Sequence, residues 1–324
     1  MAAYTPRLRS ISLLAAFSAP PHAPPQILPG FHRGTGLGFI VAPGGTGKSF
    51  LLLELAVELA LGETQRAALS THHLGPLLGG LSTDPVRVAA VMAEDPEWAV
   101  AGRLASIGGL YRPAARALVD ARAQVFVRAS GSLALAEQSR SGGVEFTPFF
   151  EREILPLMDT ADVLLLDPWA HFHRLETENA AMPFAVLFDR LADEAQARRC
   201  DIIIAAHTTK AAERDGDDSA AAMRGSGAQA YGARWLLALR RPTDAEREAW
   251  LTAGMVGATD RLVVAHQAKP NYGSPPADVV LRRDPATGVL LPVPAAFTGA
   301  GSQPAGHTQP RGRVTPMRRG KVAP

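Results

Sequence analysis

The feature that most constrains this chain is a short glycine-rich stretch, "APGGTGKS" (residues 42–49), between two apolar segments. The segment before it, "GLGFIVA", is apolar throughout, which is typical of a buried strand. The segment after it, "KSFLLLELAVELALG", has the spacing of a helix that ends at Gly62. A strand, a tight loop and a helix in this order predict an α/β fold with the loop at one rim of the sheet.

Apolar strands and helices alternate along most of the chain. The other expected strands cover residues 86–95, 124–129, 162–167, 201–207, 235–241 and 261–269, and a hairpin follows over 278–293. The expected helices after the first cover residues 97–109, 149–158 and 182–199. This pattern favours a mostly parallel sheet flanked by helices on both faces, with antiparallel strands at the C-terminal edge.

The chain divides into three expected parts. One α/β domain covers residues 28–295 and follows an N-terminal arm, residues 1–27. Residues 296–324 are rich in glycine and proline, and no acidic residue follows Asp284, so we expect a disordered basic tail. The tail either has no role or makes a weak electrostatic contact with nucleic acid.

The composition excludes several classes of protein. No apolar run approaches the ~20 residues that cross a bilayer, so we expect no membrane span. The single cysteine, Cys200, cannot form an internal disulfide or a cysteine-built zinc site, which favours a reducing compartment such as a bacterial cytoplasm. The net charge of +2 excludes a polycationic nucleic-acid coat but not a local binding channel.

The glycine-rich stretch matches the phosphate-loop pattern G-x-x-x-x-G-K-[ST] except at Ala42, where alanine fits if its φ is negative. The backbone of such a loop and the following helix N-terminus surround phosphates. Lys48 is expected to reach the β- and γ-phosphates and Ser49 to bind magnesium, so the predicted ligands are ATP and Mg²⁺. The predicted nucleotide-binding residues are Pro43, Gly44, Gly45, Thr46, Gly47, Lys48, Ser49 and Phe50.

Polar residues at three further strand ends are expected on the same rim. Asp167 closes "DVLLLD" and is predicted to hold the magnesium, with a helix cap as the alternative. Glu94 is favoured over Asp95 as the general base, although either carboxylate could instead cap the next helix. His207 ends "DIIIAAH" and is either a γ-phosphate sensor or a structural histidine. A general base favours hydrolysis over phosphoryl transfer to a small acceptor.

Several motifs in this order resemble the RepA-type hexameric replicative helicases, which are RecA-like, AAA-type P-loop ATPases. The similar stretches are "ISLLAAFSAPP", "PGGTGKS", "AEDP", "LLLDPWAHFHRLETENA", "IIAAHTTKAA", "RGSGAQAYGARW" and "QAKPNYGSPPADVVLRR". They span nearly the whole expected domain, and "FH" before "ETENA" and "KPNYG" are specific to that family. The resemblance implies a RecA-like core, with Lys48, Glu94, Asp167 and His207 as catalytic residues.

The resemblance also implies residues that act between subunits. Arg234 in "GARW" matches the arginine that enters the neighbouring subunit's nucleotide site, and Lys269 in "AKPNYG" is expected to act beside it. By itself the sequence favours an exposed surface charge at Arg234. A homohexameric ring around single-stranded DNA is implied, with a replication initiator or primase as candidate partners. The N-terminal arm either lies on a neighbouring subunit or is a frayed terminus.

In RecA-like rings, the loops after the strands of Asp167 and His207 face the central channel. These loops are expected at about residues 171–180 and 208–227. The candidate DNA contacts are His173, Arg174, Lys210 and Arg224, with His171 and Phe172 as further candidates. The second loop also contains Glu213, Asp215, Asp217 and Asp218, whose charges repel a phosphate backbone.

The leading hypothesis is therefore an ATP-driven DNA helicase that acts in the replication of a plasmid, phage or integrated element. The first alternative is a RecA-like recombination or loading ATPase that does not translocate as a ring. The second is a regulatory protein that ATP switches without unwinding DNA.

Overall fold

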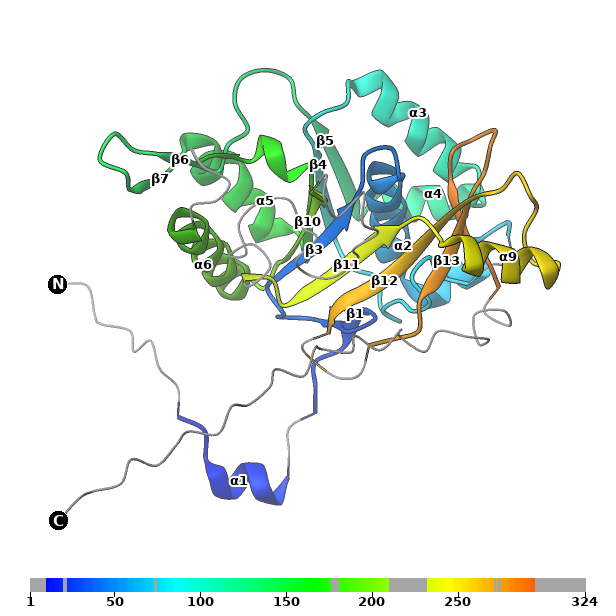
Figure 1. The fold of residues 1–324 in the computed structure, drawn as a ribbon. Helices are drawn as coiled ribbons and strands as arrows, with labels where there is room; N and C mark the ends of the chain where they lie inside the picture. Colours follow the sequence, from blue (N-terminus) through cyan, green and yellow to red (C-terminus); the bar gives the residue numbers. More distant parts are fainter. Residues whose placement is uncertain are drawn as a thin grey trace, which may run out of the picture.

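A large sheet with helices on both faces forms the body of the protein (Figure 1). The computed structural model describes residues 10–19, 22–72, 75–175, 181–209, 232–270, 272 and 275–294. The parallel strands are β3 (Leu37–Ala42), β4 (Val88–Met92), β5 (Ala123–Val127), β8 (Val163–Asp167), β10 (Asp201–His207) and β11 (Trp235–Arg240). The antiparallel strands are β12 (Arg261–Pro270), β13 (Val279–Arg283) and β14 (Leu290–Pro292).

Helices connect most of these strands. They are α2 (Lys48–Leu69), α3 (Glu97–Gly108), α4 (Pro113–Asp120), α5 (Leu155–Thr160), α6 (Ala181–Arg198) and α9 (Asp244–Thr252). A π-helical turn, η1 (Phe150–Ile154), leads directly into α5. None of the helices that the structure describes is long and apolar enough to cross a membrane.

The strand order across the sheet is β14-β13-β12-β11-β3-β10-β8-β4-β5. Neighbouring strands from β11 to β5 pair in parallel, whereas β12, β13 and β14 pair antiparallel at the other edge. The predicted fold class, a mostly parallel sheet between helices with an antiparallel C-terminal edge, is confirmed. It is the arrangement of RecA-like P-loop NTPases.

Several short elements were not expected from the sequence. They are α1 (Leu13–Ser18), the hairpin β1 (Gln26–Leu28) and β2 (Phe31–His32), the helices α4 and α9, and a small sheet of order β7-β6-β9. The small sheet consists of β6 (Ala136–Gln138), β7 (Val144–Phe146) and β9 (His173–Arg174), which follows a 3-10 turn, η2 (Trp169–His171). Strands of two or three residues are too short to show a periodicity, so sequence patterns do not detect them.

Successive side chains of β3 enter two different layers of the core. Phe39 and Val41 belong to the layer under α6, where the rings of Phe39 and Phe188 lie 5.6 Å apart. Ile40 points to the opposite layer and packs in the cluster that contains Leu51 of α2. Each fully buried side chain of this size contributes roughly 1.5–3 kcal/mol. A strand covered on both faces must be apolar at every position, which explains the continuous apolar runs.

Gly62 divides α2 into two helical segments. Its φ of 68° and ψ of 163° break the helix, which then resumes and ends at Leu69. A Cβ on Gly62 would lie 2.7 Å from the backbone nitrogen of Pro85 and 2.8 Å from the carbonyl oxygen of Thr83. The predicted helix end at Gly62 is therefore confirmed for the first helical segment, and the second segment, which ends at Leu69, was not expected.

Replacing Gly62 with alanine should lower the free energy of unfolding by about 2 kcal/mol or more, because the side chain meets both a positive φ and a backbone contact. Gly102→Ala is the matched control. Gly102 lies within α3 with no atom within 4 Å of an added Cβ. There alanine should be neutral or stabilising by up to about 1 kcal/mol. Urea unfolding measures both variants, and equal destabilisation of the two would contradict this account.

Two glutamates are buried one turn apart on α2. Glu54 Oε1 accepts the N–H of Leu290 at 2.8 Å, and Glu58 accepts the N–H of Leu77 at 3.1 Å. Arg66 Nε lies 4.0 Å from Glu58. Despite these contacts, burial raises the pKa of Glu58 to about 7 and raises the pKa of Glu54 well above its ordinary value. Glu58 therefore titrates near neutral pH in the folded protein.

The raised pKa of Glu58 makes stability depend on pH. Between 4.5 and about 7, the folded protein binds more protons at Glu58 than the unfolded chain, so its stability falls as pH rises through this window. Glu58→Gln removes this titration. Relative to the unchanged protein, the variant should gain on the order of 2–3 kcal/mol between about pH 4.5 and about pH 8. Unfolding free energies at the two pH values test this, and a constant difference between the two proteins would exclude it.

Candidate functional site

Four ends of parallel strands meet at one rim of the sheet. His207, the last residue of β10, is the register partner of Ala42 at the end of β3. Asp167, the last residue of β8, is the partner of Met92 at the end of β4. The chain runs from Ala42 into the phosphate loop and from Met92 to Glu94. Parallel register therefore places the predicted acids, the histidine and the loop together at the carboxyl rim of the sheet, where α/β folds bind ligands.

The phosphate loop, residues 42–49, has open space along its backbone. Gly45 and Gly47 have φ values of 74° and 103°, and a Cβ built on Gly45 meets no atom within 4 Å. Thr46 Oγ1 donates to the carbonyl oxygen of Pro43 at 2.6 Å, which closes the turn. Ala42 is the last residue of β3 and does not have a positive φ, so alanine fits this position as expected.

Lys48, Ser49 and Asp167 form a charged cluster where the loop enters α2. Lys48 is 7% exposed and Asp167 is 3% exposed, and the side chain of Ser49 lies close enough to Asp167 to lower the pKa of its carboxyl group. Burial lowers the pKa of Lys48, and attraction to Asp167 and Glu94 opposes this. Burial raises the pKa of Asp167, and the Ser49 side chain and the Lys48 charge oppose this. Charges held in such a poorly hydrated place act strongly on a charged ligand.

The groups in this cluster fit a nucleoside triphosphate with Mg²⁺. Mg²⁺ takes oxygen ligands, usually one or two from protein and the rest from phosphates and water. Ser49 and Asp167 present a hydroxyl and a carboxylate side by side, next to the Lys48 ammonium. In the described ranges, no group of three or more His, Cys, Asp or Glu side chains could hold a metal ion. A metal at this rim would therefore take its remaining ligands from phosphates or water.

The two carboxylates after β4 differ in their surroundings. Asp95 forms an ion pair with Arg103 of α3 at 2.5 Å. Glu94 is exposed and forms no hydrogen bond or ion pair with any residue that the structure describes. Its charge nevertheless acts on both Lys48 and Asp167. Glu94 is thus the more available proton acceptor beside the cluster, and its role as the general base stays a prediction.

His207 is half-buried beside the start of the phosphate loop. Its neighbour Thr208 donates its N–H to the carbonyl oxygen of Ala42 at 3.2 Å, so the strand end and the loop start are directly joined. The loop that follows, from residue 210 to residue 231, lies outside the described residues. The role of His207 as a γ-phosphate sensor stays a prediction.

Phe50, in the first turn of α2, lies near two arginines that the sequence reasoning did not associate with the site. The guanidinium of Arg103 lies 5.5 Å from the Phe50 ring centroid, and that of Arg283 lies 5.7 Å from it. Arg103 comes from α3 and Arg283 from β13, and neither belongs to a phosphate-loop motif. Only the tertiary structure associates them with the loop.

Arg234 and Lys269 lie at the opposite rim of the sheet. The N–H of Arg234 donates to the carbonyl oxygen of Leu37, at the start of β3, and Lys269 pairs with Leu236 in register. The two cations are close, since burial and then the Arg234 charge lower the pKa of Lys269. The 6 residues of β3 separate the two rims. That length is about 20 Å, so neither cation reaches the phosphate loop of its own chain.

The first predicted channel loop is largely packed into the protein. Phe172 is fully buried, so its expected role as a stacking ring for DNA is wrong. The ring of His173 lies 5.0 Å from the ring of Trp169 and 5.0 Å from that of Phe184. The apolar core surrounds Phe172, whereas His173 is half-buried, so a DNA contact at His173 stays a prediction.

Of the predicted DNA-binding cations in the two loops, Arg174 is the one within the described residues, because Lys210 and Arg224 lie outside them. Arg174 is exposed and its Nε donates to Ser132 Oγ at 3.2 Å. Its register partner is Glu137, which lies opposite Glu145 in the same small sheet. The local charge is therefore mixed, and a DNA contact at Arg174 stays a prediction.

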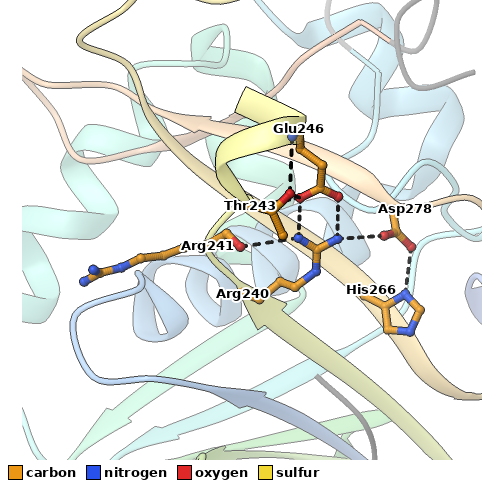
Figure 2. A network of polar contacts seen from close by, with 6 residues as sticks. All are labelled: Arg240, Arg241, Thr243, Glu246, His266 and Asp278. Atoms are coloured by element: carbon orange, nitrogen blue, oxygen red, sulfur yellow. Dashed lines mark hydrogen bonds and ion pairs between the residues drawn. The ribbon is translucent and has the colours of Figure 1, made fainter. Parts of the chain in front are cut away.

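A polar network fastens α9 to the antiparallel edge of the sheet (Figure 2). The Arg240 guanidinium donates to both carboxylate oxygens of Glu246, at 2.7 and 2.8 Å, and lies 3.5 Å from Asp278. Asp278 also pairs with His266 Nδ1 at 2.8 Å. The hydrogen bonds from Arg240 lower the pKa of Glu246 to about 2. Because Asp278 directly precedes β13, the network fixes where this strand begins.

The sequence and the fold are similar to those of known proteins. The model of an AAA domain family matches residues 2–213, which is more than half of the chain, so the chain belongs to this family. A DnaB-like replicative helicase, solved to study its interactions with primase, has a similar fold, with a TM-score of 0.52 at 12% identity. The similarity covers 80% of this chain and 57% of that one.

The ATPase domain of a second protein has a similar fold as well, with a TM-score of 0.50 at 11% identity, over 80% of this chain and 85% of that domain. At such low identities the likeness establishes the fold. The chain spans little more than half of the DnaB-like helicase that it matches. The family match and the fold together identify a P-loop ATPase with the core fold of replicative helicases.

Proposed function

We propose that this protein is an ATP-driven DNA helicase of the RepA type. It hydrolyses ATP between the subunits of a homohexameric ring, moves along single-stranded DNA and unwinds duplex DNA during replication of a plasmid or other mobile element. The bacterial cytoplasm is the proposed compartment, and a replication initiator or primase is the proposed partner.

The observation that supports a ring most strongly is the separation of the two rims. Lys48, Glu94 and Asp167 lie at one rim, and the cations Arg234 and Lys269 lie together at the other. Head-to-tail contacts in a ring bring one surface of each subunit against a different surface of the next. A cation supplied in trans can accelerate phosphoryl transfer by ~10³-fold or more and couples hydrolysis to subunit movement.

Each residue at the carboxyl rim has a separate proposed role in ATP hydrolysis. Lys48 holds the β- and γ-phosphates, and Ser49 with Asp167 holds the magnesium ion. When bound, Mg²⁺ neutralises charge on the phosphates. Glu94 accepts a proton from the attacking water, for which its lack of a partner among the described residues leaves it available. His207 responds to the presence of the γ-phosphate.

The N-terminal arm, residues 1–27, is proposed to contact a neighbouring subunit. Helix α1 has no buried residue, and Figure 1 shows it apart from the sheet. Its apolar side chains Leu13, Leu14 and Phe17 are exposed, Phe17 by 80%. An exposed apolar helix of this kind is stabilised when a second surface covers it. The main domain, residues 28–295, and the basic tail, residues 296–324, complete the proposed organisation.

The DNA-binding surface is proposed to include His173, Arg174, Lys210 and Arg224. Cations track the phosphate backbone in single-strand binding, and stacking rings add affinity. Strong dependence of DNA binding on salt is therefore expected.

Glu94→Gln and Asp95→Asn distinguish the two carboxylates. Glu94→Gln should retain nucleotide binding and lower ATP turnover by about 10²-fold or more, because the glutamine cannot accept the proton. Asp95→Asn loses an ion pair with Arg103 and should change turnover much less. Steady-state ATP hydrolysis and equilibrium binding of a fluorescent ATP analogue measure both effects. A greater loss in Asp95→Asn would assign the base to Asp95.

Mixing two inactive variants tests the ring and the DNA motor together. Lys48→Ala subunits lack the phosphate-binding lysine but keep Arg234. Arg234→Ala subunits lack the arginine but keep Lys48. If the sites lie between subunits, random mixing should restore ATP turnover at roughly a quarter of the interfaces. Single-stranded DNA should stimulate both the unchanged protein and the mixture, and the unchanged protein should unwind a forked duplex.

The possible results separate the alternatives. No recovery on mixing would exclude catalysis in trans by Arg234. DNA-stimulated turnover without unwinding would favour a recombination or loading ATPase. Turnover that is indifferent to DNA would favour a nucleotide-switched regulator.

A further inference from the structure

Arg283, the last residue of β13, lies against the phosphate loop of its own chain. Its Nη1 atom donates to the carbonyl oxygen of Gly45 at 3.5 Å, and its guanidinium lies 5.7 Å from the ring centroid of Phe50. Gly45 belongs to the loop and Phe50 to the first turn of the helix that follows it. The arginine thus contacts both the middle of the phosphate loop and the helical residue that directly follows the loop.

The hairpin of β13 and β14 is fastened to this place by several contacts. The N–H of Leu290 donates to the buried Glu54 at 2.8 Å, and Leu290 lies 3.7 Å from where a Cβ on Gly47 would be. At the hairpin turn, Gly288 has a φ of 80°, and a Cβ there would lie 3.1 Å from the Phe50 ring. The turn therefore packs directly on the loop side of α2, and Arg283 is held there by a rigid element.

The charge of Arg283 is not neutralised by the residues that surround it. The structure shows no ion pair between Arg283 and a carboxylate among the residues it describes. The nearby carboxyl group, Glu54, is buried, and its raised pKa favours the neutral form. The preceding residue, Arg282, is paired with a carboxylate, because its guanidinium lies 3.9 Å from Asp260. Its side chain also points to the other face of the strand.

We propose that Arg283 is a nucleotide-binding residue supplied by the same chain, which adds a second positive charge to the phosphate cradle beside Lys48. The ligands are nucleoside di- and triphosphates, and the contact is to their phosphate groups. An uncompensated guanidinium beside a phosphate loop strengthens anion binding, because its attraction is not cancelled by a local carboxylate. This inference rests on the proposed ATPase function of the site.

Four variants test the proposal by binding of a fluorescent ADP analogue, with unlabelled ATP and inorganic tripolyphosphate as competitors. Arg283→Ala should weaken all three ligands by about tenfold. Arg282→Ala, which removes the same charge from the next position, should change affinity less than about twofold. Arg283→Lys should recover more affinity than Arg283→Gln, since lysine keeps the charge whereas glutamine keeps a hydrogen-bond donor alone. Circular dichroism and thermal unfolding confirm that each variant is folded.

Each contrary result has a definite meaning. Unchanged affinity in Arg283→Ala, or equal losses in Arg283→Ala and Arg282→Ala, would overturn the proposal. Better recovery by glutamine than by lysine would also overturn it, because the arginine would then only brace the loop. Weakened ADP with unchanged tripolyphosphate would exclude a phosphate contact. Lys48→Ala separates this test from the proposed function. If Lys48→Ala binds nucleotide normally, the ATP site itself is misassigned. If Lys48→Ala loses nucleotide binding while Arg283→Ala keeps it, only the role of Arg283 is refuted.

Discussion

The parallel pairing of β3 with β10, and of β8 with β4, is the constraint on which the whole site depends. Evenly spaced hydrogen bonds fix the register, so Ala42 ends level with His207, and Asp167 ends level with Met92, two residues earlier along the neighbouring strand β10. The positive end of the α2 dipole and the backbone of the phosphate loop then lie beside these strand ends, where an anionic ligand would bind. A one-residue slip in any of these strands would turn its functional side chain into the core.

The electrostatics of the rim follow from burial at this level of the sheet. Lys48 and Asp167 each have a pKa displaced toward the neutral form by desolvation, and each is partly restored by the other. The same burial extends along α2 to Glu54 and Glu58, whose carboxyl groups titrate far above their ordinary range. The N-terminal end of α2 thus carries its charged groups at the ligand site. The raised pKa values of Glu54 and Glu58 favour their protonated, neutral forms, which limits the energetic cost of burying them.

The length of the strands decides which groups can act within one chain. Arg234 and Lys269 are fixed at the amino rim by β11 and β12, about 20 Å from the phosphate loop, a distance that no side chain crosses. Arg283, by contrast, is returned to the carboxyl rim because β13 runs antiparallel to β12 and its hairpin folds over Phe50. This side of the sheet therefore carries cations at both rims. Arg283 faces the phosphate loop of its own chain, whereas Arg234 and Lys269 lie at the amino rim, away from that loop.

The sequence by itself determined the parallel strands, the phosphate loop and the acids at the strand ends, because each depends on local pattern: a continuous apolar run, a glycine spacing, or a polar residue just after a strand. It also predicted the ATP-binding residues and the preference for Glu94. The tertiary structure decided what depends on contacts between distant segments. Among these are the close approach of Pro85 to Gly62, the burial of Phe172, and the ion pair between Arg103 and Asp95. The positions of Arg283 and Arg234 were decided in the same way, because only the pairing direction of the strands determines the rim at which a side chain emerges.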